Sequence, residues 1–314
     1  MQPLISIITV NYNALDVTCE MIESIRRNSY PKVEIIVVDN ASEENPGGYL
    51  QKHYPDVKFI RSEKNLGFAG GNNLGIRAST GDFLFFLNND AELTNGALET
   101  LLEVFVKHPR AGIASPKICY YIAKPGSGPD MIQYVGTTHV HPLTARNSTI
   151  GEMELDEGQY TELKETAYAH GAAMMVSRKV LKEAGLMPED FFLYYEELDW
   201  CERIRRSGYK VYVEPNAKIY HKESYSVNKI STLKTYYLNR NRIFFMKRNR
   251  SKIQMMGFWL FLFLFTVPKN TVRFILKMDW PNLKAFYRAI LWNIKARKDI
   301  SPSSTPLTFK LKLK

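Results

Sequence analysis

Short apolar runs rich in β-branched residues alternate with amphipathic segments over about the first 115 residues, and this alternation restricts the fold more than any other feature. The runs expected as strands are 4–10, 33–38, 57–60, 83–87 and 112–114. Crossover helices between such runs favour parallel pairing. Apolar side chains on both faces of the strands require helices on both sides. The pattern therefore predicts an α/β domain with a Rossmann-like, mainly parallel sheet and flanking helices.

A polar cluster, Asn88, Asn89 and Asp90, follows the expected buried strand 83–87. Open α/β sheets bind ligands at the carboxyl ends of their strands, so this position predicts a ligand-binding carboxylate at Asp90. Asp39 ends the second strand at the same expected edge, where it can accept hydrogen bonds from a base or a ribose. A turn or a helix cap is the alternative explanation of the polar cluster.

A glycine-rich stretch, 65–73, precedes this strand and is interpreted as part of a nucleotide pocket. The candidate residues in it are Asn65, Gly67, Gly71 and Asn72. Its glycines do not follow the spacing of the dinucleotide-binding fingerprint, and loop glycines more often serve backbone geometry than phosphate binding. Taken alone, the glycines leave both interpretations open.

Residues 120–166 interrupt the strand and helix pattern with Pro, Gly and an acidic run at 152–157. We expect an elaborated loop or small subdomain there, serving as a substrate lid or simply as a surface excursion. Regular structure is expected to resume with strand 172–176, a helix capped by Ser177 and a further strand at 209–214.

Three carboxylates, Glu196, Glu197 and Asp199, stand at the start of a predicted helix that ends near Gly208. The helix macrodipole favours negative charge there, which is a sufficient structural reason for them. The aromatic residues in 191–195 would also shield these carboxylates from water. A partly desolvated carboxylate has a raised pKa and can act as a general base.

His221 lies beyond the last predicted strand. With Asp90 it could complete a mixed oxygen and nitrogen site for Mn²⁺ or Mg²⁺, whose other positions would be filled by water and substrate phosphates. An ordinary surface or core histidine is the alternative. The three cysteines are far apart in the sequence and form neither a disulfide framework nor a zinc site, which favours a reducing cytoplasm.

The net charge of +10 is concentrated at the carboxyl end of the chain. Residues 222–314 contain 20 Lys and Arg and three acidic residues, a net +17, whereas the remaining 22 basic and 29 acidic residues give −7. These basic residues alternate with an apolar run at 258–267. A membrane surface with anionic lipids explains both properties together, and nucleic acid explains only the charge.

The apolar run is shorter than the roughly 20 residues that span a bilayer, and it is expected to end at Pro268. We therefore expect it to lie in the membrane interface. Trp259, Trp280 and Trp292 fit an interfacial belt. A buried core helix, or a contact between two copies of the chain, is the alternative.

The motifs in their order resemble the family 2 glycosyltransferases, and most of all the bacterial rhamnosyltransferase-like members. The matching segments are 8–13, 38–42, 65–73, 87–90, 170–173 and 195–201. The resemblance covers residues 4 to about 225. It implies a GT-A fold and inverting transfer of a sugar from a nucleoside diphosphate, with Mn²⁺ or Mg²⁺ holding the diphosphate.

The resemblance also implies roles for individual residues. The implied nucleotide-sugar-binding set is Thr9, Val10, Asn11, Asp39, Asn65, Gly67, Gly71, Asn72, Asn89 and Asp90. Asp90, His221 and Asn88 would hold the metal, and Asn88 stands where many relatives have an aspartate. Metal affinity is therefore expected to be lower than in those relatives.

On the same mapping, Glu197 removes the proton from the acceptor hydroxyl, with Glu196 beside it as the fallback. Many relatives have an aspartate in place of Glu197. His170, Gly171 and Asp199 would lie on the acceptor side of the site.

The expected organisation is a glycosyltransferase domain at 1–228 and a basic, aromatic-rich helical membrane-association region at 229–314. Within the domain, the nucleotide-sugar half extends to about residue 115 and the acceptor half covers 116–228. We expect transfer of rhamnose or another hexose from dTDP or UDP to a lipid-linked or polysaccharide acceptor in cell-envelope glycan synthesis. The cytoplasmic face of the cell membrane is the expected location.

A homo-oligomer formed through the carboxyl-terminal region is an open expectation, and no nucleic-acid partner is expected. Two other functions remain open. One is an inactive nucleotide-sugar-binding membrane scaffold, which Asn88 supports. The other is a sugar nucleotidyltransferase that would use Lys64 on a triphosphate, which would leave the carboxylates after Tyr195 unexplained.

Overall fold

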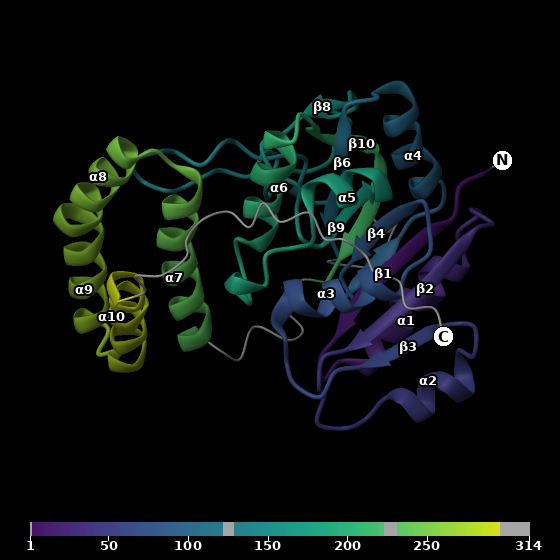
Figure 1. Cartoon of the computed structure of the whole chain (residues 1–314), viewed down its shortest axis with the longest axis horizontal. Helices are drawn as coiled ribbons and strands as arrows, with labels where there is room; N and C mark the ends of the chain where they lie inside the picture. Colours follow the sequence, from purple (N-terminus) through teal and green to yellow (C-terminus); the bar gives the residue numbers. More distant parts are fainter. Residues whose placement is uncertain (1, 122–128, 223–230, 296–314) are drawn as a thin grey trace.

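The computed structural model describes residues 2–121, 129–222 and 231–295. In these ranges a sheet of 10 strands has helices on both faces and a helical bundle at one side (Figure 1). The strand order is β3-β2-β1-β4-β9-β6-β10-β5, with β7 beside β6 and β8 beside β10. The strands are β1 Ile5–Asn11, β2 Val33–Asp39, β3 Lys58–Arg61, β4 Phe83–Leu87, β5 Ala91–Leu93, β6 Ala111–Tyr120, β7 Ile132–Tyr134, β8 Lys164–Glu165, β9 Ala173–Ser177 and β10 Lys210–His221.

Helices cover both faces of this sheet, as its apolar strands require. Helices α1, α2 and α4 pack on one face, and α3, α5 and α6 pack on the other. The helices are α1 Leu15–Arg26, α2 Gly47–His53, α3 Gly67–Ala78, α4 Ala97–Lys107, α5 Arg178–Ala184, α6 Glu196–Arg206, α7 Ser231–Asn249, α8 Lys252–Phe261, α9 Val267–Leu276 and α10 Trp280–Lys295.

The predicted mainly parallel α/β architecture is confirmed. Strands β3, β2, β1 and β4 pair in parallel, as do β6 and β10. Strand β9 lies antiparallel between β4 and β6, which the sequence pattern did not reveal. Strands β6 and β10 also extend well beyond the ranges predicted for them, 112–114 and 209–214. A register shift between Glu214 and Lys218 lets β10 bend and continue to His221.

The predicted end of the apolar run at Pro268 is wrong. A π-helical turn, η2 Leu262–Thr266, joins α8 to α9, and the resulting helix Lys252–Leu276 has 25 residues. Pro268 lies in the first turn of α9, directly after this wider turn. A π turn relieves the clash and the missing hydrogen bond that proline causes inside an α-helix. The helix is therefore long and apolar enough, by length and composition alone, to cross a membrane.

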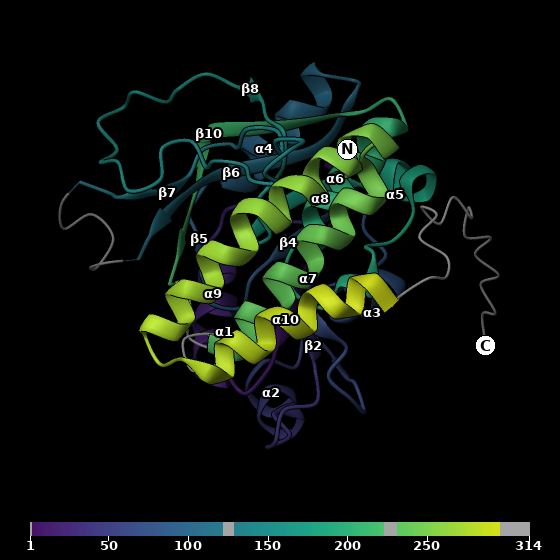
Figure 2. The same ribbon diagram turned by 90° about the vertical axis from the view of Figure 1, so that its left-hand side faces the viewer.

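The carboxyl-terminal helices share a hydrophobic core with the sheet domain. Figure 2 shows α8 and α9 as one continuous helix, with α7 and α10 beside it. The buried side chains of Phe245 on α7, Phe258 on α8 and Phe286 on α10 belong to the same cluster as Trp200 on α6. The boundary predicted between 228 and 229 falls in an undescribed segment, and the helices after it pack against the domain before it.

Trp292 does not fit the predicted interfacial belt. Its ring packs edge-on against Phe244, with ring centroids 5.6 Å apart, and Arg240 lies 4.7 Å above it. Trp280, by contrast, is 56% exposed. The bundle therefore has one face turned to the sheet domain and another turned to solvent.

Candidate active site

The structure brings the predicted metal-ligating residues together at one edge of the sheet. The Oδ1 atom of Asp90 lies 3.1 Å from Nε2 of His221, and Nδ2 of Asn88 lies 3.3 Å from the same nitrogen. Strand pairing explains this meeting, because β10 runs antiparallel to β5 and places His221 opposite Ala91, the residue after Asp90. The backbone N–H of Lys222 also donates to the Asp90 carbonyl at 2.9 Å.

Gln133 on β7 fixes the orientation of the His221 ring. Its Oε1 lies 2.8 Å from Nδ1 of His221, so Nδ1 carries a hydrogen when this oxygen accepts. The Nε2 atom is then left without a hydrogen and lies beside both the Asp90 carboxylate and the Asn88 amide. This donor set, one carboxylate oxygen and one imidazole nitrogen beside an amide, suits a divalent cation. No sequence motif marks Gln133 as a site residue.

The two glutamates that begin α6 differ in exposure. Glu196 is 3% exposed, and its Oε2 has no hydrogen-bond partner within the described ranges. Burial, followed by the charge of Glu197, raises the pKa of Glu196 well above its ordinary range. Glu197 is only half-buried, and burial raises its pKa to about 7. Glu197 is therefore the better placed of the two to exchange a proton with a ligand.

His170 and Gly171 connect the glutamates to the metal-candidate residues. The His170 and His221 rings are 6.1 Å apart at their centroids. A Cβ atom added to Gly171, the next residue, would lie 4.0 Å from the Glu197 carboxyl carbon. The backbone N–H of Ala172 donates to Nδ1 of His170, and burial lowers the pKa of His170 to about 3. A neutral imidazole therefore lies between the two parts of the site.

Asp199 is turned to the carboxyl-terminal helices. Its side chain is 1% exposed, accepts a hydrogen bond from Nδ2 of Asn249 at 2.7 Å and lies 3.3 Å from Nε of Arg248. These contacts give Asp199 a structural role in joining α6 to α7. We therefore leave it out of the acceptor side proposed below.

Asp39 and Asn11 lie in one hydrogen-bond network at the ends of β1 and β2. Asp39 is fully buried, accepts from Nδ2 of Asn11 at 2.8 Å and from Oγ of Ser42 at 2.5 Å, and lies 3.3 Å from Arg61. The hydroxyl of Thr18 continues the network by donating to Oδ1 of Asn11 at 3.0 Å. Ser42 and Thr18 were not predicted as site residues.

The same network reaches the metal-candidate edge. Nδ2 of Asn89 donates to the Thr18 hydroxyl at 3.0 Å, which places Asn89 beside the Asn11 side of the site. Asn65 is exposed, and its Oδ1 accepts from Nδ2 of Asn40 and from the Gly67 backbone N–H. Asn40 and Thr18 therefore join segments that are far apart in the sequence.

The glycine-rich stretch forms α3, and its glycines permit close packing. A Cβ atom on Gly71 would lie 2.9 Å from the Val10 side chain, and Asn72 is 2% exposed and donates to the Phe68 carbonyl. The Thr9 side chain is fully buried. We therefore leave Thr9, Gly71 and Asn72 out of the proposed nucleotide contacts, because packing already occupies them.

Gly67 also has a packing role. Its φ is +72°, and an added Cβ atom would lie 2.1 Å from the carbonyl oxygen of Phe192. The backbone N–H of Phe68 donates to that same carbonyl at 2.8 Å. Gly67 thus lets α3 approach the loop that precedes Glu197, which does not require a phosphate contact.

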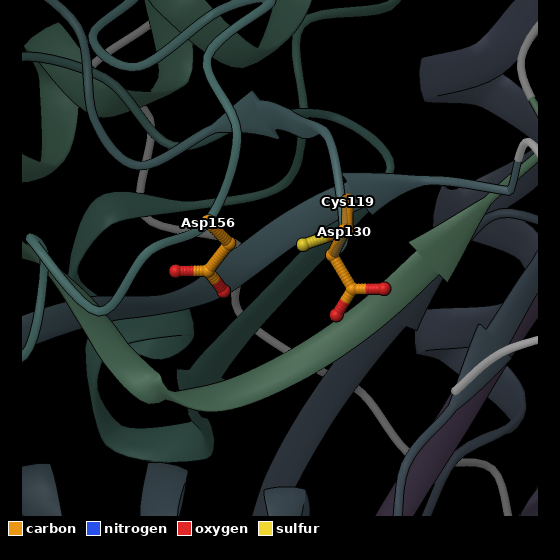
Figure 3. A group of neighbouring side chains, drawn as sticks. All are labelled: Cys119, Asp130 and Asp156. Carbon is orange, nitrogen blue, oxygen red and sulfur yellow. The ribbon is translucent and has the colours of Figure 1, made fainter. Parts of the chain in front are cut away.

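Cys119, Asp130 and Asp156 form a second group of potential ligands (Figure 3). Nζ of Lys117 lies 2.8 Å from Asp156, and Nζ of Lys218 lies 2.8 Å from Asp130 and 3.1 Å from Asp156. Burial alone would raise the pKa of Asp156, but hydrogen bonds from these lysines lower it overall. Two ammonium groups neutralise both carboxylates, so this group is an ion-pair network.

Comparison with known proteins identifies the family. The family model described as Glycosyl transferase family 2 matches residues 6–185. A low-salt glycan biosynthesis hexosyltransferase from Haloferax volcanii is 31% identical over 217 residues, covering 66% of this chain and 63% of that protein. An N-acetylglucosaminyl-diphospho-decaprenol L-rhamnosyltransferase from Mycobacterium tuberculosis is 22% identical over 246 residues, covering 73% and 79%. The match to the Haloferax protein thus spans less than two thirds of its length.

Two solved structures share the fold. S. aureus TarS in complex with UDP-GlcNAc has a TM-score of 0.60 at 16% identity, covering 93% of this chain and 80% of that chain. A mannosyltransferase from Pyrobaculum calidifontis with GDP-Man and Mn²⁺ has a TM-score of 0.57 at 14% identity, covering 95% and 89%. These likenesses confirm the predicted GT-A fold. Because the family model matches more than half of the chain, the chain belongs to glycosyl transferase family 2.

Proposed function

We propose that this glycosyltransferase transfers a hexose or 6-deoxyhexose from a nucleoside diphosphate sugar to a hydroxyl group, with inversion at the anomeric carbon. The observation that carries the proposal is the meeting of two groups at one sheet edge. Asp90 and His221 are in contact, and the His170 and Gly171 pair links them to Glu197. A metal-binding pair beside a raised-pKa carboxylate supports charge stabilisation and proton removal in one site.

Asp90 and His221 would hold Mn²⁺ or Mg²⁺, with Asn88 as a neutral third group. When bound, the cation would stabilise the negative charge that develops on the leaving nucleoside diphosphate. Gln133 keeps the Nε2 lone pair of His221 facing this position. The Pyrobaculum structure, which contains Mn²⁺, supports a divalent cation for this fold.

Glu197 would act as the general base, and Glu196 would not. The acceptor hydroxyl loses its proton to Glu197 as its oxygen attacks the anomeric carbon. A base must reach the acceptor, and of the two carboxylates Glu196 is almost fully buried. One carboxylate suffices for a single displacement, because no covalent sugar intermediate forms. The loop at His170 and Gly171 would line the acceptor side.

The donor and acceptor classes rest on the relatives. One of them is named as a rhamnosyltransferase acting on a decaprenol diphosphate sugar, and another is named a dTDP-rhamnosyl transferase, from Shigella flexneri. The second name supports dTDP as the donor nucleotide, the TarS complex with UDP-GlcNAc supports UDP, and the first name supports a lipid-linked acceptor. A polysaccharide acceptor in cell-envelope glycan synthesis is the alternative that we propose beside it. Asn11, Asp39, Asn65 and Asn89 would surround the nucleotide.

The carboxyl-terminal bundle would hold the enzyme at an anionic membrane surface. It exposes many apolar side chains: Ile253, Met256, Leu260, Phe263, Leu264, Phe265, Val272, Ile275, Leu276, Met278, Trp280, Leu291 and Ile294. Phe258 and Leu262 on the opposite face of the long helix are buried in the shared core. A helix held along one side suits the interface better than a transmembrane position. Three free cysteines support the cytoplasmic face.

Calorimetric titration with UDP and dTDP, each with and without Mn²⁺, tests the proposal. We expect metal-dependent binding of one nucleotide and its loss in Asp90→Ala. Asp82→Ala is the matched control, because Asp82 precedes the same strand β4 at the opposite edge of the sheet. Absence of binding to either nucleotide would contradict the proposed donor, whereas binding without turnover would favour the inactive scaffold. Release of UDP or dTDP from the corresponding nucleotide sugars then measures turnover.

A further inference from the structure

We infer that Asn241 on α7 is a positioning residue, whose side-chain amide holds the loop before Glu197 in the conformation that aims this carboxylate into the site. The inference rests on the proposed role of Glu197 as the base. It also gives α7 a role in catalysis, although α7 lies in the region predicted to associate with membranes or with a second copy of the chain.

A single side-chain amide binds three backbone carbonyl groups of this loop. Nδ2 of Asn241 donates to the carbonyl oxygens of Phe191, Leu193 and Tyr194, at 2.9, 2.8 and 2.8 Å. Asn241 is fully buried, so no water competes for these bonds. An amide nitrogen has two hydrogens, so one of them is shared between two carbonyls.

Arg240 fixes which way the Asn241 amide points. Its Nε donates to Oδ1 of Asn241 at 2.6 Å, which leaves the amide nitrogen facing the carbonyl groups. Its other end donates to the carbonyls of Asp190 and Phe191 at 2.6 and 2.7 Å. Adjacent side chains of α7 thus bind the same loop over its whole length.

The loop requires such support because its backbone is unfavourable without it. Phe192, Tyr194 and Tyr195 have φ values of 67°, 71° and 75°, although none is glycine. Residues with side chains persist in the left-handed region when the surrounding structure enforces it, and such strain often occurs at functional sites. Tyr195 is the amino-terminal cap of α6, so its conformation sets the direction in which Glu196 and Glu197 begin the helix.

The bundle in turn fixes α7. Nδ2 of Asn293 on α10 donates to the Arg240 carbonyl at 2.9 Å, and the Arg240 guanidinium lies 4.7 Å from the centre of the Trp292 ring. The chain of contacts therefore runs from α10 through Arg240 and Asn241 to the loop and Glu197. The packing of the bundle against the sheet domain thus supports the loop that carries Glu197.

The test compares full-length Asn241→Leu and Asn241→Asp with the matched control Asn239→Leu. Both test substitutions remove the N–H donors, and the aspartate keeps the volume and polarity of the side chain if leucine impairs folding. Asn239 lies on the same helix, but its Nδ2 donates to the Thr235 carbonyl one turn earlier. The probe is release of UDP or dTDP from UDP-GlcNAc and dTDP-rhamnose.

We expect kcat to fall about 100-fold in both Asn241 variants, because a displacement of about 1 Å at a reacting group has this effect. The KM for the donor and the affinity for UDP or dTDP should stay unchanged, since the proposed nucleotide contacts lie on other segments of the chain. Asn239→Leu should keep wild-type turnover.

Wild-type turnover in the Asn241 variants, or an equal loss in Asn239→Leu, would overturn the inference. Glu197→Gln is measured in parallel to separate the two proposals. Full activity of Glu197→Gln would overturn the proposal that Glu197 is the base. An inactive Glu197→Gln variant together with active Asn241 variants would overturn only the role of Asn241.

Discussion

His221 and Asp90 lie 3.1 Å apart, between Nε2 and Oδ1, at the end of the last strand of the sheet in chain order. The bend in β10 and its antiparallel pairing with β5 bring them together. Gln133 contacts the far side of the same imidazole ring. The proposed metal site therefore depends on three segments that are far apart in the sequence.

Gln133→Leu should weaken Mn²⁺ binding about 10- to 100-fold, because loss of a hydrogen-bond partner behind a metal-ligating histidine frees its ring. Turnover should recover at high Mn²⁺ concentration. Calorimetric titration of the metal in the presence of UDP or dTDP measures the change. Gln133→Glu keeps an oxygen acceptor 2.8 Å from Nδ1 and serves as the control. Unchanged metal affinity in Gln133→Leu would show that His221 does not bind the cation.

Glu197→Gln should bind the nucleotide normally and lose turnover, because an amide cannot take a proton from the acceptor. Burial raises the pKa of Glu197 to about 7, so kcat of the wild type should rise with pH through this region as the base loses its own proton. Tyr194, Glu196 and Cys201 interact electrostatically with this carboxylate, and Arg240 with Glu196, so the midpoint belongs to the group. A kcat that is flat across neutral pH would contradict the assignment.

Glu196→Gln should raise the melting temperature at about pH 8 more than at about pH 5. The pKa of Glu196 is raised in the folded protein above its ordinary value of 4.5. As the pH rises above this ordinary pKa, the unfolded chain releases the proton while the folded protein still holds it. This group's contribution to stability is thus lost as the pH rises, and the neutral amide removes that loss. Thermal unfolding at both pH values measures it.

Glu202→Gln on the same helix is the control of opposite sign. Burial alone would raise the pKa of Glu202, but Arg205, Tyr168 and Arg250 lower it overall. Its contribution to stability is present above the ordinary pKa, so this substitution should lower the melting temperature at about pH 8. Equal effects of the two substitutions would refute the burial argument.

Replacing Leu264 and Phe265 together by Ser should reduce binding to anionic lipid vesicles at least about tenfold, because each apolar side chain loses its transfer free energy. These side chains are 59% and 61% exposed. Vesicle co-sedimentation measures the change, and Val106→Ser on α4, where Val106 is 80% exposed, controls for exposure alone. A dimer in solution that the same double substitution dissociates would instead assign this face to a second copy.

Gly67→Ala should lower the free energy of unfolding by roughly 1–3 kcal/mol, because a side chain there is strained at positive φ and meets the Phe192 carbonyl. Gly48→Ala on α2 is the control, since nothing lies within 4 Å of its added Cβ atom. Urea unfolding measures both variants. Unchanged stability together with lost nucleotide binding would restore the nucleotide-binding role predicted from the sequence.

The sequence by itself determined the strands of the parallel half and the polar residues that end them, including Asp39 and Asp90. These features are local, because strand-forming side chains and the residues at strand ends are read directly along the chain. It also determined that Glu196 and Glu197 begin a helix after an aromatic segment, and the order of these motifs identified the family.

The tertiary structure alone decided which residues meet. Gln133, Thr18 and Asn241 reach the site from segments that have no sequence motif, because strand pairing and helix packing join positions far apart in the chain. It also separated Glu197 from the more deeply buried Glu196, and showed that Gly71 packs closely against Val10. Burial depends on which other residues cover a side chain in three dimensions. It therefore cannot be read from the residue's type or from its spacing in the sequence.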